Sequence, residues 1–403
     1  MAEVSIKFRK NAVRGSTSPG DCINLRHPLC PDGADGVKFG TILQGGDGPL
    51  TFNIKDRGPE SRWPGIKNDA AEIYYGLERV TQHSIYEVQR NDMEGTLDYS
   101  CQGHDAHYEK GVALTFIVTD KTVRDWILQV MLGTPAAEGW LGANVMAPFV
   151  NSSQKYIDTM ETAENPTLHI GWPETAASEQ IISDLLKYCD FARGIFPGRE
   201  AKPNGLGCYV YWQHRTRGKK PKWYITKDDM AQIPGGGFKV KLDWSKYCNR
   251  VACWYKDLNG ASQVQVAEDA ASQAKYTPGS KESYRFDAQA ISGYLTAAQA
   301  YQAALTYLTI NKEPQPKGSI VIPLKKIQKI GGGMQWSGFM RAGDIVQVER
   351  DEYRAFDEAN PLDNYNAYLV EQTNVDVSAG TQELTTSDVP GSMESLLQTL
   401  QAA

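Results

Sequence analysis

Three potential zinc ligands lie close together in the sequence: Cys101, His104 and His107. Thiolate and imidazole groups suit zinc, but a zinc site also needs a fourth ligand or an open water position, and its ligands must converge. The local pattern predicts Tyr99 and Cys101 in a strand and residues 103–104 in the turn that leaves it. We therefore expect a buried cysteine beside two surface histidines, and keep metal binding at these three residues as the alternative.

Two pairs of adjacent acids, Asp228-Asp229 and Asp357-Glu358, could in principle hydrolyse a glycosidic bond. That chemistry requires two carboxyl groups about 5–10 Å apart across a cleft. Adjacent acids on one strand or turn usually point in different directions, so we interpret both pairs as solvated charges.

The spaced motifs of common enzymes are absent from the sequence. It contains no G-x-x-x-x-G-K-[ST] phosphate loop, no H-E-x-x-H, no G-x-S-x-G, and no G-x-G-x-x-G that opens a helix. The glycine triplets 235–237 and 331–333 each join strand-like segments, which predicts hairpin turns. We expect no enzymatic activity and no cofactor.

Basic and aromatic side chains offer two further possibilities for binding. The basic link over residues 215–222 indicates a solvated hairpin tip, with a phosphate or lipid contact as the alternative. The 9 tryptophans and 20 tyrosines could line a glycan site, yet Trp212, Trp244 and Trp254 alternate like core or interface residues. A carbohydrate-binding or carbohydrate-active β protein is therefore the alternative function.

Length and composition exclude several classes of protein. The chain has 403 residues, 41% apolar and 22% charged, with a net charge of -6, which is typical of a folded protein and unfavourable for wrapping nucleic acid. The 7 cysteines, an odd number without a C-x-x-C pair, indicate reduced thiols made in a cytoplasm. The charged N-terminus predicts no signal peptide, and the longest apolar run, residues 112–118, predicts no membrane segment.

The chain is predicted to be mainly β with a few helices (α+β), because short alternating segments of strand length recur along it. We expect two small β-barrel-like domains plus a mixed α/β middle region. The predicted divisions are 1–118, an N-terminal β-barrel-like domain; 119–268, a middle α+β region with helices and a second block of strands; 269–389, a C-terminal helix plus β-barrel-like domain; and 390–403, a C-terminal amphipathic helix or tail.

Two helices begin with capping signatures, Thr122 with Asp125 and Thr296 with Gln299. The second helix, over residues 296–308, is predicted to pack against the strands of the last barrel. Its expected apolar stripe is Tyr301, Leu305 and Leu308.

The C-terminal segment is predicted to be a short amphipathic helix that follows Pro390-Gly391. A helix this short is marginal alone, so we expect its apolar stripe to be an assembly interface, with docking on its own chain as the alternative. The stripe consists of Met393, Leu396, Leu397 and Leu400.

The order of motifs in the last third resembles the C-terminal domain of bacteriophage tail (baseplate) hub proteins, the tail-tip components of long-tailed phages. The motifs are residues 269–276, the capped helix, a strand over 318–324, Met340-Arg-Ala-Gly-Asp-Ile-Val-Gln-Val348, a strand over 368–377 and a Thr-rich strand over 380–386. Gly343-Asp344 matches the turn of the family's "Ala-Gly-Asp-x-Val-x-Val" strand, whereas Thr277 stands where glycine is commoner. Residues 97–107 and 181–229 are similar to the hub's first and central modules.

This resemblance implies a structural protein that forms a homotrimer with two similar β-barrels per chain, and hence six barrels around a pore. Such a ring would join the hexameric tail tube and distal-tail ring to the three-fold tip and let DNA pass. Its implied partners are the distal-tail hexamer, the tape-measure protein and the tail-fibre or receptor-binding proteins. The implied location is the virion tail tip, after assembly in the host cytoplasm.

Overall fold

The structure is a computed structural model, and its secondary structure is mainly β with a few helices, as the sequence predicts. The residues it describes are 4–9, 22–24, 34–43, 45–56, 58, 69–103, 119–126, 165, 167–170, 185–186, 191–197, 208–214, 219–233, 237–287, 293–349 and 367–388. Among them, no helix is long and apolar enough to span a membrane.

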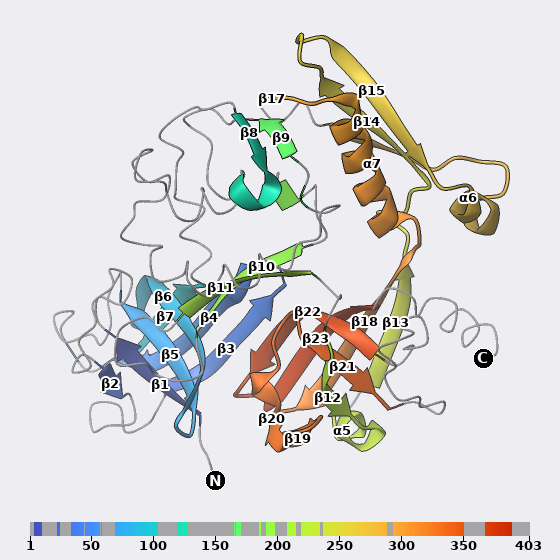
Figure 1. The fold of residues 1–403 in the computed structure, drawn as a ribbon. Helices are drawn as coiled ribbons and strands as arrows, with labels where there is room; N and C mark the ends of the chain where they lie inside the picture. The colour runs from blue at the N-terminus through green and yellow to red at the C-terminus, as the bar shows by residue number, and fades with distance from the viewer. Residues whose placement is uncertain are drawn as a thin grey trace.

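One large curled sheet of 17 strands fills the lower part of the molecule (Figure 1). Its first strands are β1 (Val4–Arg9), β2 (Cys22–Asn24), β3 (Ala34–Ile42), β4 (Gly45–Lys55), β5 (Ala70–Tyr75), β6 (Glu78–Asn91) and β7 (Thr96–Gln102). The middle of the chain adds β10 (Phe191–Pro197), β11 (Cys208–His214), β12 (Pro221–Ile225) and β13 (Gly237–Asp243). The last part adds β18 (Gln315–Pro323), β19 (Lys326–Lys329), β20 (Gly333–Trp336), β21 (Ile345–Val348), β22 (Ala367–Asp376) and β23 (Thr381–Asp388).

The sheet runs without a break from the N-terminal strands to the C-terminal ones. β3 pairs antiparallel with β22, and Phe39 lies opposite Val375. From the sequence we predicted these strands to lie in two separate barrel-like domains. Local alternation shows that a segment is a strand, but it does not show which distant strand the segment pairs with. The sheet is mixed, since β10 runs parallel to β4 and β12 runs parallel to β21.

The core lies inside this curled sheet and joins both ends of the chain. Alternation along β7 buries Leu97, Tyr99 and Cys101 and leaves their neighbours at the surface or half-buried. The Tyr99 ring stacks on Phe52 at 4.8 Å between centroids. Tyr75 of β5 stacks on Trp336 of β20 at 4.5 Å, so aromatic packing also connects N-terminal and C-terminal strands.

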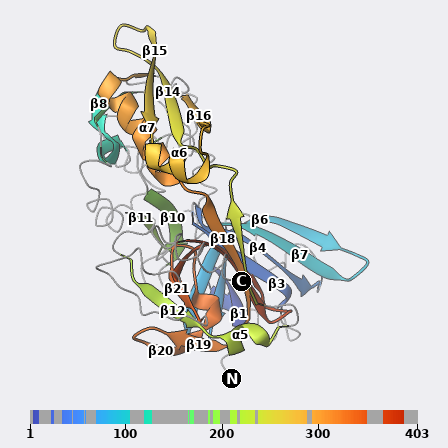
Figure 2. The same ribbon diagram turned by 90° about the vertical axis from the view of Figure 1, so that its right-hand side faces the viewer.

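A smaller module rises above the large sheet (Figures 1 and 2). Its three-stranded sheet has the order β15 (Ser262–Glu268), β14 (Arg250–Lys256) and β16 (Ser283–Asp287). Helix α7 (Ala297–Asn311) packs on β14 and β15, and the short helix α6 (Ala270–Tyr276) follows β15.

Helix α7 begins as the sequence predicts. Thr296 Oγ1 accepts a hydrogen bond from Gln299 N, and Gln299 Oε1 accepts one from Thr296 N, which together form a capping box. Leu308 of its predicted stripe is buried as expected, but the other two stripe residues and the predicted partner need correction. The Tyr301 side chain is 44% exposed and Leu305 is half-buried, and the helix covers the small sheet rather than a barrel. The buried residues are Ala300, Ala303, Ala304, Leu308 and Asn311.

The other predicted helix start is also present. Residues 123–126 are helical, and Thr122 Oγ1 accepts a hydrogen bond from Asp125 N at 3.1 Å. Val123 and Trp126 are buried, as the helical spacing predicts. Nearby, β8 (Thr119–Thr122), β9 (Thr167–Ile170) and β17 (Gly293–Tyr294) form a second small sheet.

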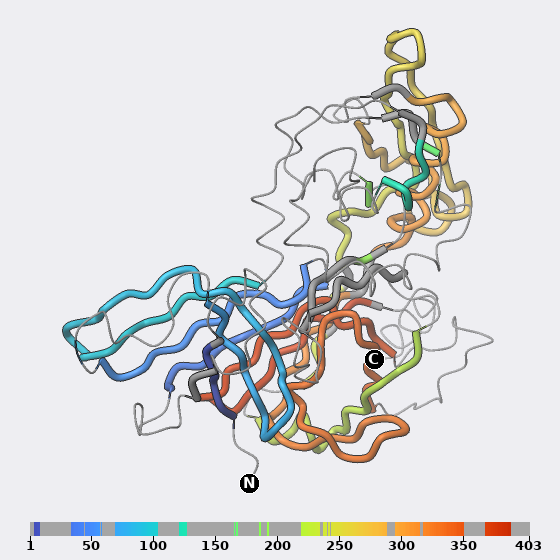
Figure 3. The backbone as a smooth tube through the Cα atoms, turned by 60° about the vertical axis from the view of Figure 1, so that its left-hand side comes forward, coloured from blue at the N-terminus to red at the C-terminus, as the bar shows by residue number. Residues whose placement is uncertain are grey.

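The β6–β7 hairpin projects from the edge of the large sheet (Figures 2 and 3). β5 accompanies β6 only as far as Ser84, and beyond Ser84 β6 is paired by β7. Side chains near its tip are exposed, with Tyr86 at 50% and Met93 at 96%. On its other side β7 pairs with β4 and buries Leu97 in the core, so it is the tip of the hairpin that extends beyond the core.

Candidate functional site

A seam of buried polar side chains joins the N-terminal and C-terminal strands of the large sheet. Thr41 of β3 and Thr373 of β22 face each other, with 2.8 Å between their hydroxyl oxygens. Thr373 Oγ1 also accepts from Thr41 N, and Thr41 Oγ1 accepts from Ala342 N at 2.7 Å. These bonds satisfy polar groups at a buried strand pairing and so fix its register.

Asp344 anchors the turn between residues 341 and 344 against β12. Its carboxylate accepts hydrogen bonds from Lys222 Nζ at 2.6 Å, Trp223 Nε1 at 3.0 Å and Arg341 N at 3.2 Å. Burial raises the pKa of Asp344, but the Lys222 charge and these hydrogen bonds outweigh burial and hold the pKa below its ordinary value. Gly343 makes the turn possible because its φ is +90°.

Arg341 reaches across the seam to the N-terminal strands. Its Nη2 donates to the Val80 carbonyl oxygen at 2.6 Å. Its charge also acts on Asp47, a β4 residue whose Oδ2 accepts from Gln82 N at 3.2 Å. Burial raises the pKa of Asp47 to about 7, although Arg341, the Gln82 amide and Arg79 each lower it.

Asp47 predicts a pH-dependent stability. The folded carboxyl binds its proton more tightly than an unfolded one with a pKa of 3.8. Its contribution to stability is therefore fully present below pH 3.8 and is lost as the pH rises through about 7. We expect Asp47→Asn to remove this loss between pH 5 and 8 in equilibrium unfolding. Asp35→Asn, at an exposed site, serves as the control. Equal slopes in Asp47→Asn and the unmodified protein would contradict the assignment.

A fully buried ion pair lies in the neighbouring strands β5 and β6. Arg79 Nη1 donates to Glu72 Oε1 at 2.9 Å, and both side chains are 0% exposed. Tyr74 Oη donates to Glu72 Oε2 at 2.9 Å and Gln82 Nε2 donates to Glu72 Oε1 at 2.6 Å, so both carboxylate oxygens have partners. The network compensates a charge that burial would otherwise make very costly.

His83 lies beside this network as a neutral ring. Burial lowers its pKa to about 3, against a hydrogen bond with the Gly48 carbonyl oxygen that raises it. Since a carbonyl only accepts, Nδ1 carries the proton and donates to Gly48 O at 2.9 Å. The Thr81 hydroxyl then donates to Nε2 at 2.8 Å. Both ring nitrogens are therefore engaged in hydrogen bonds within the protein.

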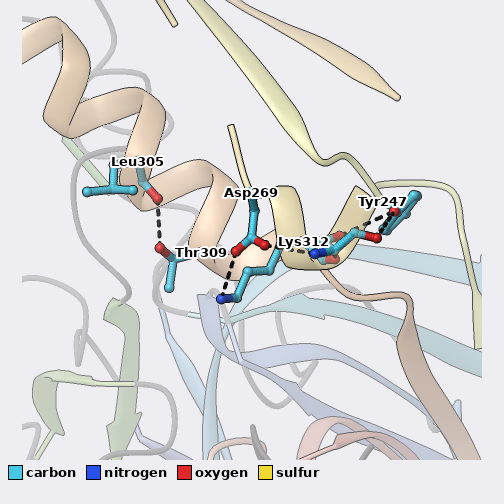
Figure 4. Close-up of polar contacts among 6 residues, drawn as sticks. Tyr247, Asp269, Leu305, Thr309 and Lys312 are labelled. Carbon is cyan, nitrogen blue, oxygen red and sulfur yellow. Dashed lines mark hydrogen bonds and ion pairs between the residues drawn. The ribbon is translucent and has the colours of Figure 1, made fainter. Parts of the chain in front are cut away.

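A second polar cluster forms the neck between α6 and the end of α7 (Figure 4). Asp269 caps α6, with Oδ1 accepting from Ser272 N at 2.8 Å and Oδ2 from Lys312 Nζ at 3.1 Å. The Ser272 hydroxyl donates to the Lys312 carbonyl oxygen and lies 3.2 Å from the Tyr247 hydroxyl. The hydrogen bond from Ser272 N is the main reason that the pKa of Asp269 lies below its ordinary value. Residues 269–276, which carry part of the family resemblance, thus attach the small module to the chain that enters β18.

Known proteins are similar to this chain in fold but not in sequence. No protein-family model and no curated protein matches the sequence. The tail protein from Neisseria meningitidis MC58 has a TM-score of 0.57 at 11% identity, with 96% of this chain and 98% of that chain covered. This chain has the fold of a phage tail protein.

Two further solved structures agree over nearly the full length. The 43 kDa tail protein of prophage MuSo2 from Shewanella oneidensis has a TM-score of 0.54 at 12% identity, covering 96% of this chain and 98% of that one. The prophage tail protein gp18 from Listeria monocytogenes EGD-e has a TM-score of 0.53 at 11% identity, covering 99% and 98%. The resemblance read from the order of sequence motifs is thereby confirmed for the fold.

In this tail-protein fold, the structure describes one of the three residues for which zinc binding was the alternative. Cys101 is buried in β7, and burial raises the pKa of its thiol far above the ordinary value, which disfavours the thiolate that zinc needs. His104 and His107 lie outside the described residues. Among the residues that are described, no group of three His, Cys, Asp or Glu side chains could hold a metal ion.

The acidic pair Asp228-Asp229 caps a helix rather than facing a cleft. Both residues lie in the first turn of α5 (Lys227–Ala231), where Asp229 is buried and Asp228 is exposed. Asp229 Oδ2 accepts from the Thr226 backbone and hydroxyl, and Oδ1 pairs with Lys325 at 2.8 Å. The second pair, Asp357-Glu358, lies outside the described residues.

One end of the basic link and the second glycine triplet lie among the described residues, and both have structural roles. Lys219 Nζ donates to the Gly343 carbonyl oxygen at 3.0 Å, so this end of the link docks on the seam. Residues 215–218 of the link, with its two arginines, lie outside the described residues. The triplet 331–333 forms the predicted hairpin turn between β19 and β20, with positive φ at Gly331 and Gly333.

The tryptophans of the described residues are mostly used for packing. Trp126, Trp223 and Trp336 are buried, and Trp254 is half-buried beneath the Arg285 guanidinium at 4.8 Å. Trp244 is 49% exposed and meets Tyr247 and Tyr276 edge to face, at 5.3 and 5.9 Å. No flat row of exposed rings, the usual glycan platform, occurs in these contacts.

Sequence reasoning missed Thr41 and Thr373 of the seam and both residues of the buried ion pair. A signal was present at Glu72, which stands in the otherwise apolar strand Ala70–Tyr75. A charge inside an apolar strand indicates a buried partner, but nothing local says which basic residue supplies it. The four residues predicted to form an assembly interface, Met393, Leu396, Leu397 and Leu400, lie outside the described residues.

Proposed function

We propose that this chain is a structural protein of a phage tail. The observation that carries the proposal is the agreement in fold, over 96% or more of the chain, with tail proteins from three bacterial genomes or prophages. The side chains that could do chemistry support it, because Asp47, Glu72, Asp229 and Asp344 are engaged in holding strands and turns together. The proposal includes no catalytic step and no cofactor.

The specific role we propose is that of the hub at the tail tip or baseplate. Three copies would form a ring with pseudo-six-fold symmetry that joins the hexameric tail tube and distal-tail ring to the three-fold tip. The continuous seam supports this role, because a ring that transmits load needs its strands tied into one body. The net charge of -6 also suits a pore through which DNA passes without being held.

The proposed partners are further copies of the chain, the distal-tail hexamer, the tape-measure protein and the tail-fibre or receptor-binding proteins. The site of action is the virion tail tip, following assembly in the host cytoplasm. Electron micrographs of the purified chain test this role. Rings with a central pore are expected, whereas single compact particles at every concentration would contradict it.

The C-terminal segment is proposed to act in assembly. We expect deletion of residues 391–403 to leave the thermal unfolding midpoint of the monomer unchanged and to impair ring formation, since the stripe beginning at Met393 would lose its contact with neighbouring copies or with the tape-measure protein. Truncated chains that still build tails at normal yield would refute the role. Truncated chains that fail to fold would show that the segment docks on its own chain.

A further inference from the structure

The projecting part of the β6–β7 hairpin carries unpaired negative charge. Residues 84–98 contain four acidic side chains and one basic one, and the basic one, Arg90, is already paired with two aspartates. Glu87 and Glu94 are exposed, and neither side chain has an ion-pair partner among the described residues. Met93, next to Glu94 at the turn, is 96% exposed. We call Glu87, Met93 and Glu94 the acidic patch.

The edge of the large sheet at β13 carries unpaired positive charge. β13 pairs with β18 on one side, and no described strand pairs with its other side. Phe238 packs against the core, so Lys239 and Lys241, which flank positions of alternating direction, lie on the outer face. These two lysines and Lys246, just beyond the strand, are exposed, and none of the three has an ion-pair partner among the described residues.

An exposed tryptophan lies beside these lysines. Trp244 directly follows β13 and is 49% exposed, with one side of its ring against Tyr247 and Tyr276. Asp243 does not offset the lysines, because its carboxylate is paired with Lys317 at 2.6 Å. Tryptophan is among the residues that most often anchor protein–protein interfaces. We call this surface the basic patch; its members are Lys239, Lys241, Lys246 and Trp244.

The two patches lie on different sides of the molecule. β13 forms the right-hand edge of the large sheet in Figure 1 and faces the viewer in Figure 2. The β6–β7 hairpin projects sideways from the sheet in Figure 2 and away from the body in Figure 3. The patches therefore do not meet within one chain. Two different patches of one chain that fit each other make a head-to-tail contact, which closes into a ring when the rotation between copies allows it.

We infer that the acidic patch of one copy of this chain docks on the basic patch of the next copy. The inference rests on the proposed function, in which three copies surround an axis. A three-fold ring needs two different, matching patches on each chain, because a patch that matches itself gives only a two-fold pair.

Charge complementarity favours a second copy as the occupant. The exposed carboxylates of one chain are unpaired, and so are the exposed lysines of the next, so each patch supplies what the other lacks. DNA would meet the lysines but would leave the acidic patch without a partner. Lysines on an edge strand oppose strand addition, so we expect the contact to be made by side chains, with Met93 and Trp244 as its apolar part.

The first test needs no variant. Unlabelled and isotopically labelled full chains are mixed when dilute, concentrated together and treated with a carbodiimide, which joins a carboxylate to a lysine amine in contact with it. We expect mixed-isotope peptides that link residue 87 or 94 to residue 239, 241 or 246. The Glu268–Lys281 pair, at 2.8 Å within one chain, is the control for the chemistry. An associated chain that gives the control link without the mixed-isotope link would overturn the inference.

The second test reverses the charges. We expect Glu87→Lys with Glu94→Lys, and separately Lys239→Glu with Lys241→Glu, to weaken self-association by roughly tenfold or more, because like charges then face each other. The chain that carries all four substitutions should associate like the unmodified chain. Glu78→Lys, at an exposed site at the opposite end of β6, is the control and should not change association. Since all these sites are exposed, thermal midpoints should stay within a few degrees.

The outcomes separate this inference from the proposed function. If the unmodified chain associates and both charge-reversed variants associate equally well, the docking surfaces are wrong and the tail role stands. If the unmodified chain is monomeric at every concentration, the docking and the ring both fall. If a charge-reversed variant fails to fold, the cross-links of the unmodified chain decide.

Discussion

Replacing Glu72 by glutamine is expected to lower the free energy of unfolding by about 3–5 kcal/mol, because the fully buried Arg79 guanidinium would lose the carboxylate charge that lies 2.9 Å from it. Chemical denaturation at equilibrium measures this change. The matched control is Asp92→Asn, which breaks the exposed Arg90–Asp92 pair. Such surface pairs contribute less than about 1 kcal/mol.

A double substitution distinguishes lost charge compensation from lost packing. Replacing Glu72 and Arg79 together by methionine removes both charges and keeps much of the volume. We expect the double variant to recover only part of the stability that Glu72→Gln loses. Exchanging a buried ion pair for apolar residues is often neutral, but Tyr74 Oη and Gln82 Nε2 would lose their acceptor. A loss below about 1 kcal/mol for Glu72→Gln alone would show that the pair is solvated, contrary to its 0% exposure.

The second large effect is expected in helix α7. Leu308 is 1% exposed beneath the small sheet, so Leu308→Ala should cost about 2–5 kcal/mol through the cavity it leaves. Tyr301→Ala is the matched control on the same helix, at a side chain that is 44% exposed, and should change stability by less than about 1 kcal/mol. Equal losses in both variants would contradict the placement of α7 against β14 and β15.

Local sequence patterns predicted the elements of this fold well and their partners poorly. The capping box at Thr296 could be predicted because it involves only Thr296 and the residue three positions later, and the structure contains it. The buried side of α7 could not be predicted from local sequence. It consists largely of alanines, at 300, 303 and 304, whose apolar signal is weak beside that of Tyr301. Small residues nevertheless allow the helix to lie close to a sheet. The tertiary contact, rather than side-chain size, decided which face is inside.

The seam shows the same limit more strongly. The hydrogen bond between Thr41 and Thr373 joins residues 332 positions apart, and the sequence near either threonine does not predict contact with the other. The Gly343-Asp344 turn was recognised as a family motif, but the contacts of Asp344 with Lys222 and Trp223 depend on how β12 pairs with β21. The motif order carried information about the fold that no single residue did, and the comparison of folds agrees with it.

The mass of the purified full chain in solution, measured by light scattering coupled to size exclusion, tests the central claim most directly. A structural tail hub is expected to have three times the 44.6 kDa of one chain. A stable 44.6 kDa monomer that binds or cleaves a polysaccharide would contradict the account and favour a carbohydrate-active β protein.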